Sequence, residues 1–386
     1  MKRGIFVLAL VLSLFLTACA QKIEAEIVLP EPEPMVEVLA EPEPEPEPAP
    51  EPLPEGAEIL LFGLRTQTLT DGASCYVDAA QFAEKAGLEL LPQDDALTLT
   101  DGEASVDFPL CRSDALESGG AFLQSGTYYL PVSFAAERFG FVTGTAEDGT
   151  TYLAKELDLS APKENVNVPV LMYHAVSDDI WGYWDLFVSP KTLEEELLYL
   201  QENGYQTIWF EDLSHLEDYE KPVILTFDDG YDDNYTELFP LLQKYSAKAT
   251  IFVIPKAIGS PHKMTAEQVY ELSQSGLVSI QSHTYSHGNL STMNEEKLIF
   301  EMEASKNYIA ALTGQVPYTV CYPEGRYSEL AVEVAGRYYD YGLLMNGMLY
   351  NTSDDPLRVK RFYVPRGYDL GSFTWSVQDA GTSRNW

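Results

Sequence analysis

The chain has 386 residues and a formal net charge of −36 at pH 7. This length is sufficient for two domains in addition to a targeting segment. The large acidic excess argues against nucleic acid as a partner and against docking on anionic phospholipid, because both would be repelled. A neutral or cationic polymer is easier to accommodate.

Residues 1–18 have the pattern of a signal peptide. Lys2 and Arg3 precede the apolar segment GIFVLALVLSLFL, which is too short for a comfortable transmembrane helix. The segment ends in Leu-Thr-Ala-Cys, which resembles a bacterial lipobox and implies cleavage before Cys19 and lipidation of its sulfur. The alternatives are an ordinary secretory signal cut nearby or an uncleaved anchor. In each case we expect an extracytoplasmic protein, and the lipobox predicts a lipoprotein anchored in the membrane at the cell surface.

Residues 19–56 are rich in glutamate and proline and are interpreted as a linker. Alternating Glu and Pro favour polyproline II, and charge repulsion stiffens the segment. At ~3.1 Å per residue, positions 30–54 span roughly 80 Å. The linker therefore predicts a stalk between the membrane and the folded part.

Residues 57–157 are predicted to form a small α+β domain with an internal repeat. Positions 74–108 and 125–154 each contain a strand with tyrosine, a helix (78–86 in the first half) and further strands. The pattern resembles the small N-terminal domain of copper amine oxidases, which implies a non-catalytic module for cell-wall or glycan binding. The domain has no histidine, so no copper site is implied. Cys75 and Cys111 are interpreted either as a disulfide or as two buried thiols.

Residues 165–386 alternate between short apolar segments and helical patterns. This order predicts βα units and a parallel sheet, closed into a barrel, whose functional residues lie at the carboxyl ends of the strands. The predicted strands are 168–173, 206–210, 222–227, 249–254, 278–282, 318–322, 341–345 and 362–364, and the predicted helices are 191–203, 235–246, 265–275 and 294–313.

Polar residues with metal-binding chemistry follow three of these predicted strands. His174 ends the first, Asp228 and Asp229 end another, and His283 and His287 follow a third with an H-x3-H spacing. Two imidazoles and one carboxylate can hold a divalent cation and leave positions open for water and substrate, while the second aspartate acts as a base. Taken alone, Asp-Asp-Gly is usually a turn and H-x3-H is often incidental. Their joint placement at strand ends indicates a site.

Other polar residues of this region are interpreted without a functional role. His215 and His262 fall in polar stretches and are expected at the surface. The aspartates 228, 229, 232 and 233 do not have the alternating ligands and the glutamate at the twelfth position that an EF-hand calcium loop requires.

The motifs TFDDG at 226–230, SHTYSH at 282–287 and CYPEG at 321–325 together resemble the polysaccharide deacetylase domain, also called the NodB homology domain, of carbohydrate esterase family four. The resemblance covers roughly residues 165–380. It implies a distorted (β/α) barrel with fewer than eight strands and a divalent metal, usually zinc.

The resemblance also assigns roles to individual residues. Asp229, His283 and His287 match the metal ligands of the family, and Asp228 matches its general base. The backbone N–H of Tyr322, in the third motif, matches the donor to the oxyanion.

The chain departs from the family pattern at two positions. Many members have an arginine at the start of the third motif that positions the base; here Arg361 or Arg366 is the substitute. Many also have a late histidine that acts as the general acid, and no histidine follows His287. We therefore assign the acid role to His174, for which a structural hydrogen bond below the site is the alternative.

The expected activity is metal-dependent removal of N-acetyl groups from a cell-surface polysaccharide that contains N-acetylglucosamine, either peptidoglycan or poly-N-acetylglucosamine, with chitin oligomers as a further candidate. The alternative is a catalytically degenerate lipoprotein that binds glycan or assembles the envelope, because the late histidine is missing. O-deacetylation of xylan-type esters is a third hypothesis for the activity. Trp181, Tyr183 and Trp184 are interpreted either as sugar-stacking residues or as a packed lid.

Overall fold

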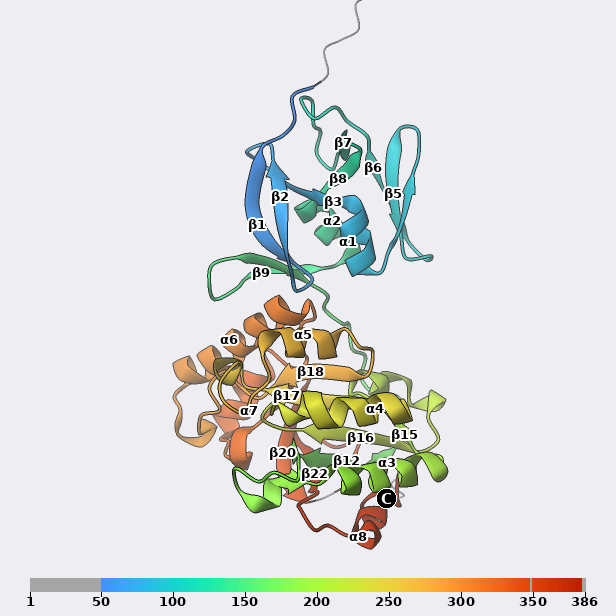
Figure 1. The fold of residues 1–386 in the computed structure, drawn as a ribbon, viewed down its shortest axis with the longest axis vertical. Helices are drawn as coiled ribbons and strands as arrows, with labels where there is room; N and C mark the ends of the chain where they lie inside the picture. Colours follow the sequence, from blue (N-terminus) through green and yellow to red (C-terminus); the bar gives the residue numbers. More distant parts are fainter. Residues whose placement is uncertain (1–49, 348, 384–386) are drawn as a thin grey trace, which may run out of the picture. The chain divides into compact units, whose positions relative to one another are not determined.

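The structure is a computed structural model that describes residues 50–347 and 349–383 (Figure 1). The predicted signal peptide, the predicted lipidation site Cys19 and nearly all of the predicted linker fall on residues 1–49, outside the described residues. Among the helices of the described residues, none combines the length and the apolar character needed to cross a membrane.

The strands and helices between Glu55 and Ala154 contain the predicted internal repeat. In each half a strand leads directly into a helix that ends at a glycine in the left-handed conformation, Gly87 or Gly140. The two repeat strands, β3 and β8, pair antiparallel, with Tyr76 opposite Pro131. The repeat is therefore present as the sequence indicates, whereas the resemblance to the amine oxidase module stays a prediction.

The elements of this region form two sheets, with strand orders β7-β8-β3-β2-β1-β10-β9 and β4-β5-β6. Cys75 and Cys111 are both free thiols of intermediate burial. The elements are β1 (Glu55–Leu61), β2 (Leu64–Thr70), β3 (Cys75–Asp78), α1 (Ala79–Ala86), β4 (Glu89–Pro92), β5 (Ala96–Thr100), β6 (Ser105–Pro109), β7 (Phe122–Gln124), β8 (Thr127–Pro131), α2 (Val132–Phe139), β9 (Val142–Thr145) and β10 (Thr151–Ala154).

The second group of strands forms a closed barrel. Within residues 50–347 and 349–383, seven parallel strands follow one another in the order β12-β22-β20-β19-β18-β17-β16, and β12 also pairs with β16, with Tyr173 opposite Phe227. This ring confirms the expectation of a (β/α) barrel with fewer than eight strands. The short strand β15 adds to the start of β16.

Each predicted strand segment and helix of this region contains the expected element. The 206–210 segment is the shortest match, because a 3-10 helix begins at Glu211 and the side chain of its second residue, Asp212, accepts a hydrogen bond from the Trp209 N–H. The strands are β11 (Asn167–Val168), β12 (Val170–Tyr173), β13 (Ala175–Val176), β14 (Phe187–Val188), β15 (Gln206–Thr207), β16 (Pro222–Phe227), β17 (Ala249–Val253), β18 (Val278–Ser282), β19 (Thr319–Cys321), β20 (Tyr341–Gly347), β21 (Tyr350–Asn351) and β22 (Val359–Tyr363).

Helices surround the barrel and begin at side chains that satisfy their free backbone N–H groups. Ser189 caps α3, Thr265 and Gln268 form a capping box on α5, and Asn294 caps α6. Two helices, α7 and α8, were not predicted. The helices are α3 (Pro190–Glu202), α4 (Phe239–Tyr245), α5 (Ala266–Ser273), α6 (Glu295–Thr313), α7 (Glu329–Ala335) and α8 (Leu370–Val377).

Alternate residues of the strands pack into different apolar clusters, as the period of two requires. Leu225 and Phe227 belong to the cluster that contains the helix residues Leu197 and Leu242, whereas Ile224 packs with Phe252 of β17. This packing fixes which residues of a strand face the helices and therefore which positions end at the rim of the barrel.

A buried glutamate lies between α3 and the first barrel strand. Glu196 is 2% exposed, and one of its oxygens accepts a hydrogen bond of 2.9 Å from the Tyr173 hydroxyl, directly before His174. Burial raises the pKa of Glu196 to about 8, against the smaller opposing effect of the Tyr173 hydroxyl. The carboxyl group is therefore protonated in the folded protein at neutral pH.

Stability is expected to fall as pH rises between the ordinary glutamate pKa and about 8, because only the unfolded chain releases this proton. In this window Glu196→Gln, which mimics the protonated group, should gain stability relative to wild type by up to roughly 5 kcal/mol, at ~1.4 kcal/mol per pH unit. Urea unfolding at pH 5 and pH 8 measures the difference. The exposed neighbour Glu195 provides the control Glu195→Gln. A Glu196→Gln advantage that does not grow with pH would contradict this account.

Candidate active site

The catalytic residues expected from the sequence meet at one rim of the barrel. His174 follows β12, Asp228 and Asp229 follow β16, and His283 follows β18, so parallel strands carry them to the same edge. These four residues and His287 line one cavity of about 630 Å³. The cavity has the size of a typical ligand site.

Three ligand atoms converge on one point in this cavity. Asp229 Oδ1 lies 3.5 Å from His283 Nε2 and 3.4 Å from His287 Nε2, and all three atoms lie within 4.8 Å of one another. One carboxylate and two imidazoles leave further coordination positions open, as catalytic metal sites require. The residues therefore fit the divalent metal that the motifs imply.

His283 is held in the tautomer that a metal ligand needs. Its Nδ1 donates a hydrogen bond of 2.9 Å to the Cys321 carbonyl oxygen, which can only accept. The Nε2 atom is therefore an unprotonated acceptor that faces Asp229. Burial lowers the pKa of His283 to about 4, so the ring stays neutral.

The Asp229 backbone and side chain are fixed by two neighbours that are not among the predicted site residues. The Tyr231 hydroxyl donates a hydrogen bond of 2.8 Å to Asp229 Oδ2, and Lys263 Nζ donates one of 2.9 Å to the Asp229 carbonyl oxygen. Burial opposes ionisation of Asp229, yet the surrounding His283 and Lys263 together hold its pKa below the ordinary value. Tyr231 stands directly after the TFDDG motif, whereas no sequence pattern marks Lys263.

The glycine of the TFDDG motif is required by its conformation and by space. Gly230 has φ +63°, in the left-handed region, and a Cβ atom there would lie 3.0 Å from Val253 Cγ1. Asp229 also has a positive φ, +76°. The turn after β16 is therefore strained in the way that functional turns often are.

Asp228 is bound on both oxygens by Arg361. Arg361 Nη1 lies 2.7 Å from Asp228 Oδ1 and Nη2 lies 2.8 Å from Oδ2, and both side chains are almost fully buried. Arg361 also donates to Thr226 Oγ1 and to the Leu344 carbonyl oxygen. This bidentate geometry fixes the position of the carboxylate.

The same pair keeps Asp228 ionised. Burial alone acts to raise the pKa of Asp228, but the charge and hydrogen bonds of Arg361 outweigh it and hold the pKa well below the usual range. Of Arg361 and Arg366, it is therefore Arg361 that contacts Asp228, the predicted base. Arg366 instead donates to the carbonyl oxygens of Ser177 and Phe187, beside β13 and β14.

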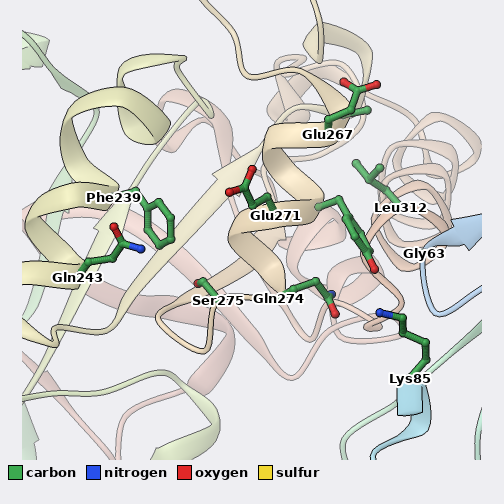
Figure 2. A pocket seen from close by; sticks show the side chains of 11 residues that line it. Gly63, Lys85, Phe239, Gln243, Glu267, Glu271, Gln274, Ser275 and Leu312 are labelled. Atoms are coloured by element: carbon green, nitrogen blue, oxygen red, sulfur yellow. The ribbon is translucent and has the colours of Figure 1, made fainter. Parts of the chain in front are cut away.

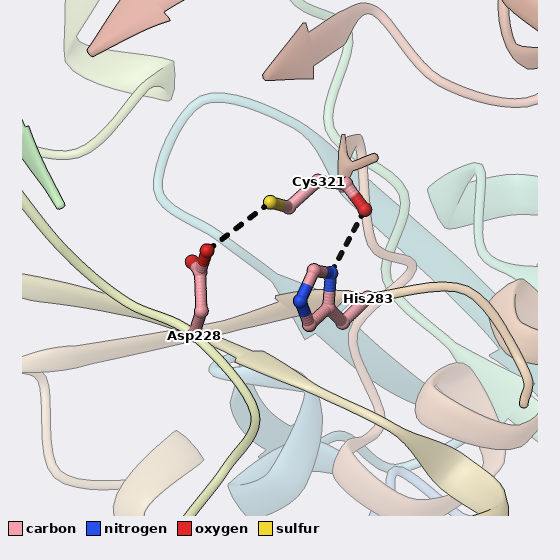
Figure 3. A group of neighbouring side chains, drawn as sticks. All are labelled: Asp228, His283 and Cys321. Atoms are coloured by element: carbon pink, nitrogen blue, oxygen red, sulfur yellow. Dashed lines mark hydrogen bonds between the residues drawn. The ribbon is translucent and has the colours of Figure 1, made fainter. Parts of the chain in front are cut away.

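Asp228, His283 and Cys321 form a second group with metal-ligand atoms close together (Figure 3). The Cys321 thiol donates to Asp228 Oδ2 at 3.4 Å and accepts from Arg361 Nη2 at 3.0 Å. Burial raises the pKa of the thiol, which opposes the thiolate that a metal would need. The Arg361 charge would also repel a cation there, so Asp229, His283 and His287 are the better set.

His174 lines the same cavity, and one nitrogen of its ring has no hydrogen-bond partner among the described residues. This nitrogen is Nδ1, and the residue is 7% exposed. Burial lowers the pKa of His174 below its ordinary value, so the ring is neutral at neutral pH. Its backbone carbonyl accepts from Asn234 Nδ2 at 3.0 Å, and Asp228 N donates to the adjacent Tyr173 carbonyl. The segments that carry His174 and Asp228 are thus hydrogen-bonded to each other.

Tyr322 occupies a different position from the one that its expected role requires. Its backbone N–H donates to the Leu343 carbonyl oxygen at 3.1 Å, and its hydroxyl donates to the Leu357 carbonyl oxygen at 3.0 Å. The N–H that the motif assigned to an oxyanion is therefore engaged between β19 and β20.

The three aromatic residues after His174 divide into two kinds. Trp181 packs edge-on against Phe187 and Tyr231 and stacks on His262 at 4.1 Å between ring centroids. Tyr183 is 81% exposed and lines the cavity, and Trp184 is 58% exposed. Trp181 thus belongs to a packed wall, whereas the other two rings have free faces.

A larger cavity, of about 780 Å³, has no comparable chemistry (Figure 2). Its lining includes Glu267 and Glu271 of α5 and Lys85, but no histidine, cysteine or aspartate. Its side chains as drawn converge on no common point. The rim of the barrel is therefore the stronger candidate.

Comparison with known sequences supports this location. The model of the polysaccharide deacetylase family matches residues 215–339. The protein YxkH of Bacillus subtilis (strain 168), whose name assigns it to the polysaccharide deacetylases, is 39% identical over 189 residues, covering 47% of this chain and 66% of YxkH. The poly-beta-1,6-N-acetyl-D-glucosamine N-deacetylase of Staphylococcus aureus (strain MRSA252) is 26% identical over 163 residues, covering 38% of this chain and 54% of that protein. The chain thus spans about two thirds of the first relative's length and about half of the second's.

Solved structures show the same fold. The deacetylase PplD of Streptococcus pyogenes, solved with acetate, aligns over 55% of this chain and 99% of its own, with 28% identity and a TM-score of 0.52. BA0330 of Bacillus anthracis aligns over 75% of this chain and 98% of its own, with 24% identity and a TM-score of 0.53, which supports the fold alone.

A parallel barrel with an aspartate pair and two histidines at its rim defines a hydrolase with a metal-binding type of site. With the family match and the relatives above, the chain is a member of the polysaccharide deacetylase family, carbohydrate esterase family four. This membership confirms the resemblance of the three motifs.

Replacing Arg361 should leave a buried, unpaired carboxylate. We expect Arg361→Met to lower the free energy of unfolding by about 3–5 kcal/mol, because the Asp228 charge then has no partner. The double variant Arg361→Met with Asp228→Asn removes both charges and should recover much of this loss. Urea unfolding of the three proteins measures both effects. A single variant within about 1 kcal/mol of wild type would show that the pair does not hold the site together.

Proposed function

We propose that the chain is a metal-dependent N-deacetylase of cell-surface polysaccharide that contains N-acetylglucosamine, either peptidoglycan or poly-N-acetylglucosamine. The observation that carries this proposal is the ionised Asp228, held by Arg361 beside three convergent ligand atoms in an open cavity. A fixed base beside a metal position is the arrangement that hydrolysis of an amide needs.

Asp229, His283 and His287 are the proposed metal ligands, and zinc is the proposed metal. A carboxylate with two imidazoles suits zinc, and the hydrogen bond from His283 to the Cys321 carbonyl orients one of these rings. When bound, the metal polarises the acetamide carbonyl and lowers the pKa of the attacking water.

Asp228 accepts a proton from the water as its oxygen bonds to the carbonyl carbon. Because Arg361 keeps the pKa of Asp228 well below the usual range, the carboxylate is ionised at neutral pH. The guanidinium also prevents rotation of the carboxylate away from the site. Because Asp228 is a weak base, the pKa of the attacking water must be lowered before Asp228 can accept its proton.

His174 delivers the proton that the leaving nitrogen needs. When the bond between the carbonyl carbon and nitrogen breaks, acetate and a free amino sugar form, and the nitrogen must gain a proton as it leaves. His174 lines the same cavity as Asp228 and Asp229, and this position supports the role. Because the ring is neutral at neutral pH, it donates to the nitrogen only after it has received a proton within the site.

A polysaccharide substrate is supported by the surroundings of the cavity. The exposed rings of Tyr183 and Trp184 can stack on sugar faces, as aromatic side chains do in carbohydrate sites. One relative is named as acting on poly-beta-1,6-N-acetyl-D-glucosamine. The proposed lipid on Cys19, the Glu/Pro linker and a wall-binding role for residues 57–157 would place the enzyme at the cell surface.

Acetate release from poly-N-acetylglucosamine, chitin oligomers and peptidoglycan, with zinc added, tests the function. We expect wild type to release acetate and Asp228→Asn to lose about 10²–10⁴-fold in rate, because the base is gone. His174→Ala should lose activity on these amides, but much less on an aryl acetate ester, whose leaving group needs no proton.

His215, an exposed histidine outside the cavity, provides the matched control, because His215→Ala should leave all rates unchanged. Zinc content is measured in parallel for each variant. If wild type binds zinc and releases no acetate from any of the polymers, the proposed deacetylase activity is rejected. The alternative of a catalytically degenerate glycan-binding lipoprotein then replaces it.

A further inference from the structure

The turn that carries the second histidine ligand is conformationally strained. It begins at Ser282, the last residue of β18, and runs to His287, and both Thr284 (φ +61°) and His287 (φ +58°) adopt the left-handed conformation. For residues other than glycine this conformation costs about 1–2 kcal/mol each. Such a turn persists only when its surroundings hold it in place.

A buried carboxylate on α6 holds this turn. Glu301 is 5% exposed, its Oε2 accepts from the Ser286 backbone N–H at 2.8 Å, and its Oε1 accepts from the Ser286 hydroxyl. Its backbone carbonyl accepts from the Tyr285 N–H at 3.1 Å. Glu301 therefore binds the two residues that immediately precede His287.

The next turn of α6 binds the other end of the same loop. Ser305, four residues after Glu301 and on the same face of the helix, shares a hydrogen bond of 2.7 Å with the Ser282 hydroxyl. Ser282 Oγ in turn accepts from the Thr284 N–H at 3.1 Å. One helix face thus fixes the start and the end of the loop.

The two histidines differ in how they are oriented. The His283 ring is fixed by its hydrogen bond to the Cys321 carbonyl. In the part of the chain that the structure describes, the His287 ring makes no comparable hydrogen bond, and its side chain is 29% exposed. The position of His287 Nε2 therefore depends on the backbone of the turn, and so on Glu301.

We propose that Glu301 is a positioning residue for metal binding, which acts through Ser286 to hold His287 in the ligand geometry. The proposal rests on the metal site of the proposed function. Glu301 has no ion-pair partner among residues 50–347 and 349–383, so its buried charge is satisfied chiefly by the Ser286 donors. Loss of this contact should release the loop and weaken one of the three ligands.

Binding of Zn²⁺ to the metal-free full chain, measured by titration calorimetry, tests the proposal. Glu301→Gln keeps the size of the side chain, but its NH₂ group cannot accept one of the two Ser286 donors. We expect its Kd for zinc to rise about 10–100-fold, as for other residues that orient metal ligands. Ser286→Ala, which keeps the carboxylate charge but removes one donor, should weaken binding in the same direction and to a smaller extent.

Glu303→Gln, an exposed carboxylate on the same helix, is the matched control and should bind zinc as wild type does. The visible spectrum of the Co²⁺-loaded protein provides a second readout, because a change in ligand geometry alters it while a change in general stability does not. Should Glu301→Gln fail to fold, Ser286→Ala carries the test alone. If both variants fold and both have the zinc affinity and cobalt spectrum of wild type, the proposal is overturned. If only Ser286→Ala folds, the same result for that variant overturns it.

The outcome is separable from that of the proposed function. If wild type binds zinc and the two variants bind it less tightly, the positioning role stands even when no polymer releases acetate. If acetate is released and Glu301→Gln binds zinc as wild type does, the deacetylase stands and the positioning role fails. A wild-type protein that binds no zinc overturns both.

Discussion

The buried pair of Arg361 and Asp228 is the interaction on which the rest of the site depends. It joins β22 to the end of β16, and the same guanidinium contacts Cys321 at the end of β19 and the Leu344 carbonyl of β20. Two charges in a low-dielectric interior are tolerated only when the geometry is good and the remaining donors are satisfied, and both conditions hold here. The pair therefore fixes the orientation of the Asp228 carboxylate and couples four strands of the barrel.

Much of the barrel and of the site could be predicted from the sequence, because both rest on local patterns. Short apolar segments with helical patterns between them indicate parallel βα units, and each segment predicted as a strand contains one. Once the strands are parallel, residues after their carboxyl ends must share one rim. Asp229, His283 and His287 therefore meet in the cavity as the motif spacing indicates. His215 and His262 are exposed, as expected from their polar surroundings.

The remaining features depend on contacts that leave no local signal. The sequence could not decide between Arg361 and Arg366, because only the register of β22 brings one of them to Asp228. Lys263 and Glu301 lie in ordinary polar stretches. Their roles arise from hydrogen bonds that join Lys263 to Asp229, in the loop of a neighbouring strand, and Glu301 of α6 to Ser286. The expected donor at Tyr322 could not be assessed either, since its use depends on how β19 pairs with β20.

The central claim is that the metal binds at Asp229, His283 and His287, while Asp228 stays outside the metal shell on Arg361. A crystal structure of the zinc-loaded protein, with the metal located by its anomalous scattering, tests this claim most directly. We predict a single peak bonded to those three side chains, with both hydrogen bonds between Arg361 and Asp228 intact. A peak between Asp228, His283 and Cys321, with the guanidinium displaced, would contradict the account.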